Sequence, residues 1–421
     1  MNYKGLFCLI FTLTHGYQLV LSLVQSRSAN NPIPANVADV YDADTYQRWR
    51  AYNGEKSRLS IWRTITSWVL TLLLLLSNFH AAAASLFPQT LFMQLFGVLL
   101  AQTLVDTLVF VGFDWVDTMV IEQKYGFNRS TVKTFVVDQV RSFVLELLLS
   151  TGMMLLLAWL HRAMGDWVVV LFTGALFLFT LLISFLYGPV FSRLGNKFVP
   201  LEEGELRTQL MALLTRHGYE VKAIEVMDAS RRTTKLNAYF TGFGKLKRIV
   251  LYDNLLTAMT PEEICAVFAH ELGHGLHKDV LKQQLMNLGN FLLMAVMVWL
   301  TVRTPAMHKA FGFDAVNYGF AFILLSGWLG LLQPLTGMGM NAYSRRAEYR
   351  ADAQAVTEGY GEVLIGGLKK LARENFSHLS PAKALVVLEY SHPPLSERIT
   401  AIHKGMADKP GAAPDPKPAT F

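Results

Sequence analysis

Three side chains that could do chemistry together lie close to one another in this sequence. His270 and His274 are four positions apart, and Glu271 follows the first histidine. Residues four apart share one face of a helix, so the two imidazoles can bind the same metal ion. Glu271 would then lie beside the pair, where its carboxylate can reach a metal-bound water. Two neutral nitrogen ligands, an adjacent carboxylate base and an open coordination position are what zinc requires to hydrolyse a peptide bond.

The segment that carries these residues is predicted to be a helix with a well-defined start. Thr260 and Glu263 fit a capping box, and Pro261 fits the first helical position. Apolar residues follow at Ile264, Val267, Phe268 and Leu272. Because H-E-x-x-H also occurs by chance, the zinc interpretation depends on this context and on a third ligand elsewhere in the chain.

A second helical segment, Asn341–Val356, supplies two carboxylates at helical spacing. Glu348 and Asp352 are four apart and therefore share a face. We predict that Glu348 is the third zinc ligand and that Asp352 accepts a hydrogen bond from the outer nitrogen of a ligand histidine. The alternative is a solvated helix, in which these acids form weak ion pairs with neighbouring arginines. The upstream pair of histidines favours the ligand interpretation.

Two β-strands are predicted just before the zinc helix, at Lys235–Phe240 and Lys247–Tyr252. The glycine-containing segment Thr241–Lys245 between them predicts a hairpin turn. An edge strand can bind an extended peptide by strand addition and hold its scissile bond across the metal. A purely structural hairpin is the alternative.

A histidine with a rigid backbone lies in the segment Glu389–Arg398. His392 precedes two prolines, which restrict the local conformation. A histidine held in this way can donate a hydrogen bond to the oxyanion of a tetrahedral intermediate. A lone histidine can also be structural, and Arg398 can either support the same negative charge or pair with an acid.

The composition of the chain is typical of a membrane protein. Of the 421 residues, 52% are hydrophobic and only 17% are charged, and the mean hydropathy is +0.30. The net charge of +6 fits basic loops that face anionic lipid, and no basic-aromatic cluster indicates a nucleic-acid partner. The two cysteines, Cys8 and Cys265, indicate neither a disulfide framework nor a cysteine metal site.

Seven stretches are apolar and close to the ~20 residues that a helix needs to span a bilayer. They are residues 5–24, 61–81, 88–112, 142–161, 167–187, 283–302 and 318–338. A cleaved signal peptide is the alternative for the first. Lysine and arginine are richest in the polar loops predicted at 25–60 and 113–141 and in two soluble blocks. With seven spans, all of these segments fall on one side, which we predict to be cytoplasmic.

The predicted fold is mainly α and integral to the membrane, with a small β-hairpin or sheet in a zinc metallopeptidase domain that is split by two spans. The predicted parts are residues 1–189 with five transmembrane helices, 190–282 with the hairpin and the H-E-x-x-H helix, 283–338 with the sixth and seventh helices, 339–405 with the third ligand and the SHPP motif, and a disordered tail at 406–421.

Taken together, the chain resembles the zinc metallo-CAAX proteases, the CAAX prenyl protease 1 family. Besides H-E-x-x-H between the fifth and sixth spans, the resemblance rests on EQKYGFNRST (Glu122–Thr131), LNAYFTGFGKLKRIVLYDNLL (Leu236–Leu256), SRRAEYRADAQA (Ser344–Ala355) and YSHPPLSER (Tyr390–Arg398). These motifs occur in the family's order over nearly the whole chain. The segment Gly275–Val280 lacks the aromatic residue and the later Gly-His of eukaryotic members, so we predict a bacterial-type member.

This resemblance implies an architecture and roles for individual residues. Seven helices would enclose a water-filled chamber in the membrane. A gluzincin-like domain would bind one Zn²⁺ per chain, with the zinc site facing this chamber. The matched positions are zinc ligands at His270, His274 and Glu348, a catalytic glutamate at Glu271, residues near the cleaved bond at His392 and Arg398, and substrate-binding strand positions at Asn237 and Ala238. Eukaryotic members of the family remove the last three residues of prenylated C-A-A-X proteins.

The sequence therefore predicts a membrane-embedded zinc endopeptidase, placed in a bacterial inner membrane with its zinc site toward the cytoplasm. Its substrates would be peptides or proteins that are prenylated or membrane-associated. One alternative is a quality-control protease that clips misfolded membrane proteins without prenyl selectivity. Another is a seven-span transporter or receptor with a structural metal site, in which Asp106 and Glu146 would belong to a transport path. Three protein ligands beside a carboxylate favour catalysis, because structural zinc sites usually have four protein ligands.

Overall fold

Long apolar helices form most of this protein, for which a computed structural model describes residues 2–187, 193, 196–219, 223–241 and 248–408. Six helical stretches in this part of the chain are long and apolar enough to cross a membrane. The fourth of them contains two helices joined by a short 3₁₀ turn, so the stretches hold seven helices, as predicted. The seven are α1 (Tyr3–Ser28), α2 (Ala43–Leu76), α4 (Leu91–Trp115), α5 (Val132–Met164), α6 (Val168–Tyr187), α10 (Asp279–Val302) and α12 (Tyr318–Thr357).

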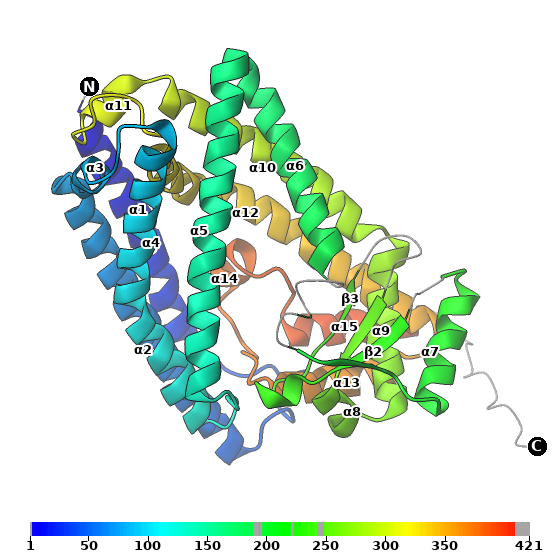
Figure 1. The fold of residues 1–421 in the computed structure, drawn as a ribbon. Helices are drawn as coiled ribbons and strands as arrows, with labels where there is room; N and C mark the ends of the chain where they lie inside the picture. The colour runs from blue at the N-terminus through cyan, green and yellow to red at the C-terminus, as the bar shows by residue number, and fades with distance from the viewer. Residues whose placement is uncertain (1, 188–192, 194–195, 220–222, 242–247, 409–421) are drawn as a thin grey trace, which may run out of the picture.

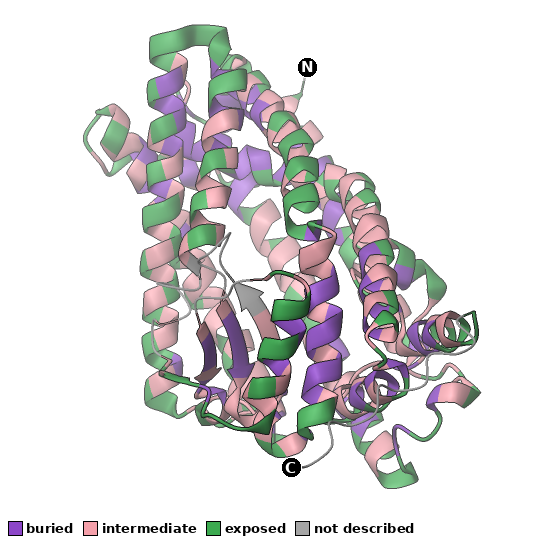
Figure 2. Cartoon of the chain, turned by 90° about the vertical axis from the view of Figure 1, so that its right-hand side faces the viewer, coloured by how far each residue is buried: buried purple, intermediate pink, exposed green. Residues whose placement is uncertain are grey.

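The long helices pack in neighbouring pairs: α1 lies along α2, α6 along α10, and α4 along α5 (Figure 1). Their outward faces carry large apolar side chains, and Trp62, Leu108 and Trp159 are each more than 60% exposed. Figure 2 shows exposed residues along the outer faces of the long helices and buried residues where elements meet. Exposed apolar faces of this extent are expected where helices contact lipid rather than water.

Two of the loops predicted from the sequence are in fact largely helical. The predicted loop at 25–60 is wrong over its second half, because α2 begins at Ala43 with Asp42 as its N-cap. The predicted loop at 113–141 is reduced to residues 125–131, because a π-helix, η2 (Val116–Glu122), and two further helical residues extend α4, and α5 begins at Val132. Hydropathy detects only the apolar part of a helix, so polar ends that extend beyond the bilayer were assigned to loops.

The seventh span and the predicted ligand helix form one continuous helix of 40 residues, α12. Pro334 lies inside it without ending it. The two predictions meet at residues 339–340, where the sequence changes from apolar to polar, so hydropathy detects only the first part of the helix. The continuity connects the candidate ligand Glu348 rigidly to the membrane region.

Shorter helices complete the chain. They are η1 (Ala35–Val37), α3 (Phe79–Ser85), η3 (Gly165–Trp167), α7 (Glu205–Arg216), η5 (Ala229–Arg231), α8 (Asp253–Ala258), α9 (Pro261–Leu276), α11 (Pro305–Lys309), α13 (Gly361–Glu374), α14 (Lys383–Leu388) and α15 (Leu395–Ala407). The tail predicted at 406–421 lies, from residue 409 on, outside the described residues.

A small mixed sheet lies beside the helices. Its strands are β1 (Phe198–Pro200), β2 (Ala223–Met227), β3 (Ala238–Thr241) and β4 (Arg248–Tyr252), in the order β1-β2-β4-β3. The pairing of β3 with β4 is antiparallel, so the predicted hairpin is confirmed; residues 242–245 of its predicted turn lie outside the described residues. The sheet is larger than predicted, because β2 joins β4 in parallel and β1 joins β2.

One apolar core holds the sheet against α7 and α9. Its members include Leu210 and Leu213 of α7, Ile249 of β4, and Phe268 and Leu272 of α9, all at most 3% exposed. Burying side chains of this size contributes roughly 1.5–3 kcal/mol each. This core fixes the orientation of α9 and therefore of any side chain on its opposite face.

Candidate metal centre and active site

Helix α9 begins as the sequence predicts. The Thr260 hydroxyl accepts from the Glu263 N–H at 3.2 Å, and a Glu263 carboxylate oxygen accepts from the Thr260 N–H at 2.8 Å. Pro261 occupies the first turn, where its missing N–H is not needed. Such a cap contributes about 1 kcal/mol and fixes where the helix starts. His270 and His274 follow on the face that points away from the core.

A glycine lets the second ligand helix approach α9 closely. A Cβ atom added at Gly273 would lie 2.8 Å from the Cα of Ala351 on α12, closer than real Cβ atoms are found. The two backbones are therefore in direct contact at this point. Glu348 lies less than one helical turn before Ala351, so this contact brings its carboxylate to the two histidines.

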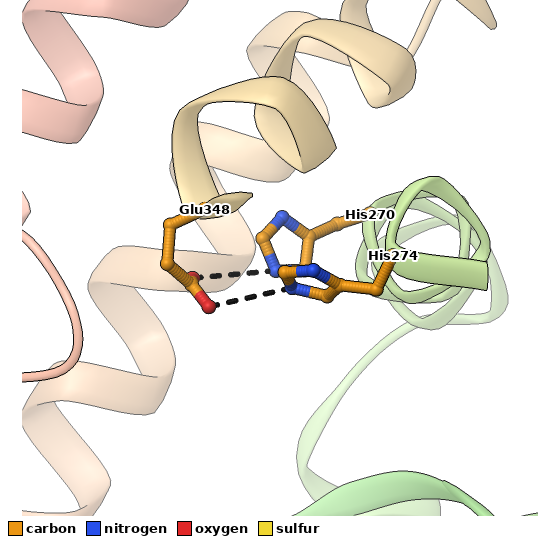
Figure 3. Close-up of side chains that lie close together, drawn as sticks. All are labelled: His270, His274 and Glu348. Carbon is orange, nitrogen blue, oxygen red and sulfur yellow. Dashed lines mark ion pairs between the residues drawn. The ribbon is translucent and has the colours of Figure 1, made fainter. Parts of the chain in front are cut away.

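The three predicted ligands do meet. Nε2 of His270 lies 3.5 Å from Oε2 of Glu348, and Nε2 of His274 lies 3.3 Å from Oε1 (Figure 3). Ligand atoms at tetrahedral corners around Zn²⁺, with bonds of about 2.0–2.1 Å, are about 3.3 Å apart. The spacing of these three side chains therefore fits a zinc ion between them. Among the described residues they form the group of His, Cys, Asp and Glu side chains that could hold a metal.

The chemistry of these donors also fits a metal. Oε2 of Glu348 is buried and has no hydrogen-bond partner within the described structure. The nearest positive charge is the Arg398 guanidinium, whose Nη1 lies 3.3 Å away without forming a hydrogen bond, so a bound metal ion would satisfy this oxygen further. Both Nε2 atoms face this carboxylate, while the Nδ1 atoms of the same rings have other partners.

Both imidazole rings contact a carboxylate through Nδ1, the nitrogen on the side opposite the candidate metal position. Nδ1 of His270 lies 2.8 Å from Oδ1 of Asp352, so His270 is the ligand histidine with which the predicted contact of Asp352 forms. Nδ1 of His274 lies 3.1 Å from Oδ2 of Asp279, which was not predicted. An N–H donated to a carboxylate fixes the ring so that its other nitrogen is free for a metal. Lys278, at φ +55°, turns the chain between the two helices and lets Asp279 point back.

Arg398 lies behind Glu348 and Asp352. Its guanidinium donates to both Asp352 oxygens, at 2.9 and 2.6 Å, and Nη1 lies 3.3 Å from Oε2 of Glu348. The residue is 9% exposed, so this ion pair is largely shielded from water. Its positive charge balances two buried carboxylates that would otherwise repel each other.

His392 approaches the same carboxylate from the solvent side. Its Nε2 lies 3.3 Å from Oε1 of Glu348, and its side chain is 65% exposed. The Ser391 hydroxyl lies 2.9 Å from Nδ1 and orients the ring. An imidazole placed here can reach a group bound next to the metal ligands.

A cavity of about 690 Å³ connects the ligands with the remaining predicted site residues. Glu271, Asn237 and Ala238 line it together with His392 and Arg398. Apolar side chains from α13 and α9 form much of another wall: Val267, Leu364, Leu368, Leu371 and Ala372. The cavity thus places the three candidate metal ligands, the carboxylate of Glu271 and the edge of a strand in one space.

Metal binding at this site should depend on pH through His274. Burial lowers the pKa of this imidazole, but hydrogen bonds to Glu348 and Asp279 and the negative charges of Glu348 and Glu271 outweigh burial and raise the pKa to about 9. Zinc requires the neutral ring and must displace a proton below that pH. We expect the zinc affinity to fall about tenfold per pH unit as the pH decreases from 8 to 6. Competition with a chromophoric chelator measures it, and a pH-independent affinity would contradict this assignment.

A second prediction about zinc affinity follows from the close contact between α9 and α12 at Gly273. Gly273→Ala should push α9 away from α12 and lower the zinc affinity by at least about tenfold, because ligand placement tolerates shifts of only about 0.5 Å. Gly366→Ala on α13 is the control, since a Cβ atom there meets nothing within 4 Å. Chelator competition compares the two, and equal zinc affinities would show that the helix contact does not position the ligands.

Two family models match this chain over nearly its full length. The model for the CAAX prenyl protease N-terminal region, with five membrane helices, matches residues 7–197. The model for peptidase family M48 matches residues 200–405. The first range contains α1, α2, α4, α5 and α6, which agrees with five membrane helices.

Curated relatives and a solved structure show the same similarity. A "CAAX prenyl protease 1 homolog" of Oryza sativa is 30% identical, with 94% of this chain and 96% of the relative aligned. "CAAX prenyl protease 1" of Saccharomyces cerevisiae is 29% identical, with 88% of each chain aligned. The crystal structure of S. mikatae Ste24p superposes with a TM-score of 0.90 at 26% identity and covers 96% of this chain and 99% of that one.

Proposed function

Because this chain belongs to peptidase family M48 and is a membrane-embedded metalloprotease, we propose that it cleaves prenylated C-A-A-X peptides with one bound Zn²⁺. The observation that carries this proposal is the single cavity that contains the three candidate ligands, Glu271 and the edge of β3. The names of the curated relatives support the choice of prenylated substrates.

His270, His274 and Glu348 would hold the zinc, with Asp352 and Asp279 fixing the two rings. The bound ion would supply a Lewis acid that polarises the scissile carbonyl and lowers the pKa of a water toward ~7. Three protein ligands leave a coordination position open, as catalysis requires.

The proton transfers are assigned to Glu271. Its carboxylate takes a proton from the attacking water and later gives one to the leaving amine. His392 donates a hydrogen bond to the developing oxyanion, which its position beside Glu348 supports. Arg398 acts through Glu348 and Asp352, because its guanidinium is committed to these two carboxylates.

The substrate would bind as an added strand on the open edge of β3, with its main chain at the outward-facing Ala238 and beside the side chain of Asn237. β3 is the last strand in the order β1-β2-β4-β3, so no other described strand pairs with its outer edge. Main-chain hydrogen bonds give such binding its affinity with little dependence on side chains. The apolar wall of the cavity suits the aliphatic residues that follow the cysteine in a C-A-A-X sequence.

We place the protein in a bacterial inner membrane with its zinc site toward the cytoplasm. Support for this orientation comes from lysine and arginine, which are concentrated before α2 becomes apolar and in the segments around the zinc site. Labelling of single engineered cysteines in these segments from either side of the membrane tests the orientation.

The activity is tested with a farnesylated C-A-A-X peptide, its unprenylated counterpart and the Glu271→Gln variant, all with purified protein in detergent. Cleavage of the farnesylated peptide alone, abolished by Glu271→Gln, is the expected result. Equal cleavage of both peptides would indicate a quality-control protease without prenyl selectivity. Cleavage of neither peptide by zinc-loaded protein would contradict the proposed substrate class.

A further inference from the structure

The outer edge of β3 presents its backbone groups in a defined order. In an antiparallel pair, successive residues direct their N–H and C=O groups to alternate sides of the strand. The Asn237 carbonyl accepts from the Tyr252 N–H at 3.2 Å, so Asn237 faces β4. Its neighbours Leu236 and Ala238 therefore direct their backbone groups away from β4, toward the open edge.

The Leu236 position on this edge is already occupied by a side chain. Oδ1 of Asn375 accepts from the Leu236 N–H at 2.9 Å, and Nδ2 donates to the Leu236 carbonyl at 3.1 Å. A side-chain amide carries an acceptor and a donor in the same arrangement as a peptide group. Asn375 thus takes the place of a residue in a neighbouring strand, and both residues line the cavity that contains the candidate zinc ligands.

Contacts with the membrane region hold Asn375 in this place. It is the C-cap of α13, and the next residue, Phe376, has φ +52°, where helix ends usually have glycine. The Phe376 ring packs on Phe127 and Tyr52, with ring centroids 4.9 and 5.7 Å apart. Its carbonyl accepts from the Trp49 indole N–H at 3.1 Å. A bulky residue keeps this conformation only where its surroundings impose it.

We propose that Asn375 is a positioning residue that ends the peptide-binding edge of β3 and fixes the register of the substrate. This inference rests on the proposed function, because it requires a peptide bound along β3. With Leu236 occupied, the first backbone position open to a peptide is Ala238. The Ala238 N–H is held by Oδ1 of Asn237 at 2.9 Å until a substrate carbonyl replaces it.

The alternative register that Asn375 excludes can be specified. Side chains alternate between the faces of a strand, so a peptide that slips by two residues keeps every side chain on its original face. Such a slip toward Leu236 would use the backbone groups that Asn375 now occupies. Excluding it sets the limit to which a peptide can shift along β3 toward Leu236, and so removes one cleavage position across from the candidate metal ligands.

Asn254 provides a matched control, because it contacts the segment that precedes β3 without lying at the open edge. The Asn254 amide donates to the carbonyls of Thr233 and Lys235, at 3.3 and 3.0 Å. Asn254 does not line the cavity, so its truncation loosens the segment without opening the edge. A merely structural role of Asn375 would give the two truncations the same consequences.

The test uses the full-length protein in detergent and a farnesylated peptide in which a run of alanines follows the prenylated cysteine, so that successive bonds are chemically alike. Mass spectrometry of the products locates each cleaved bond. The wild type and Asn254→Ala should cleave one main bond. Asn375→Ala should cleave a second bond, shifted by two residues, in a comparable amount.

A single wild-type product from Asn375→Ala, or the same second product from Asn254→Ala, would overturn the inference and leave the proposed function intact. An intact probe after incubation with the wild type would overturn the proposed function, and the inference with it. If Asn375→Ala does not purify as folded protein, Asn375→Ser replaces it with the same expected second product, because a hydroxyl is too short to fill the Leu236 position.

Discussion

Glu271→Gln should retain zinc and lose peptidase activity. The substitution keeps the size of the side chain but removes the base, and a positioned general base contributes about 10²–10⁴-fold to the rate. We therefore expect kcat to fall by about this factor at an unchanged zinc content. Metal analysis and cleavage of the farnesylated peptide, carried out on the same preparation, measure both quantities.

Glu262→Gln is the matched control for this variant. Glu262 lies on the same helix, exposed to solvent in its first turn, and does not line the cavity. It should leave kcat unchanged. Wild-type activity in Glu271→Gln would exclude Glu271 as the base. Loss of zinc together with activity would instead assign to Glu271 a role in holding the metal.

Glu348→Ala should lose the metal itself. The substitution removes the third ligand and leaves Arg398 beside two histidines with one fewer carboxylate to balance its charge. Disturbing a residue that only orients a ligand costs 10–100-fold in metal affinity. Loss of the ligand should cost more than about 100-fold, and activity should fall with zinc occupancy. Chelator competition measures the affinity.

The control for this variant is Arg346→Gln, an exposed position two residues earlier on the same helix. It should bind zinc as the wild type does. A Glu348→Ala variant that binds zinc with wild-type affinity would show that the third ligand lies elsewhere. In that case His392, whose Nε2 lies 3.3 Å from Glu348, would be the first alternative to examine.

The sequence was most informative where local signals act within one helix. The capping box at Thr260 and Glu263 predicted the start of α9, and the four-residue spacing predicted which side chains share a face. A contact of Asp352 with one of the ligand histidines was predicted as well, because carboxylates commonly orient metal-ligating imidazoles, and the structure shows that this histidine is His270. The apolar stretches likewise predicted the seven long helices, because bilayer thickness sets their length.

Features that depend on contacts between distant segments were missed. The contact of Asp279 with His274 depends on the left-handed turn at Lys278, for which the sequence has only a weak signal: an acid five positions after a ligand. Asn375 was missed entirely, because its partner Leu236 is 139 residues away. Strands β1 and β2 were also missed, since such short strands gain their stability from the sheet rather than from local propensity.

The helical first half of α2 was also missed, because it too depends on contacts between distant segments. Its first half is polar, and its mean hydropathy does not distinguish it from a loop. Trp49 and Tyr52 of this half are nevertheless buried, and both contact Phe376 at the end of α13. Tertiary contacts of this kind decide whether a polar segment is helical, and a single sequence does not display them. These contacts also connect the polar half of α2 to Phe376, the neighbour of Asn375 at the β3 edge.

The most direct test of the central claim is X-ray absorption at the zinc edge on the purified protein. We expect one zinc per chain, bound by two imidazole nitrogens at about 2.0–2.1 Å and by oxygens of one carboxylate and water at about 2.0–2.2 Å. Glu348→Ala should remove this signal. A shell of four protein ligands would contradict the account, because a closed site is structural, and so would sulfur at about 2.3 Å or protein without zinc.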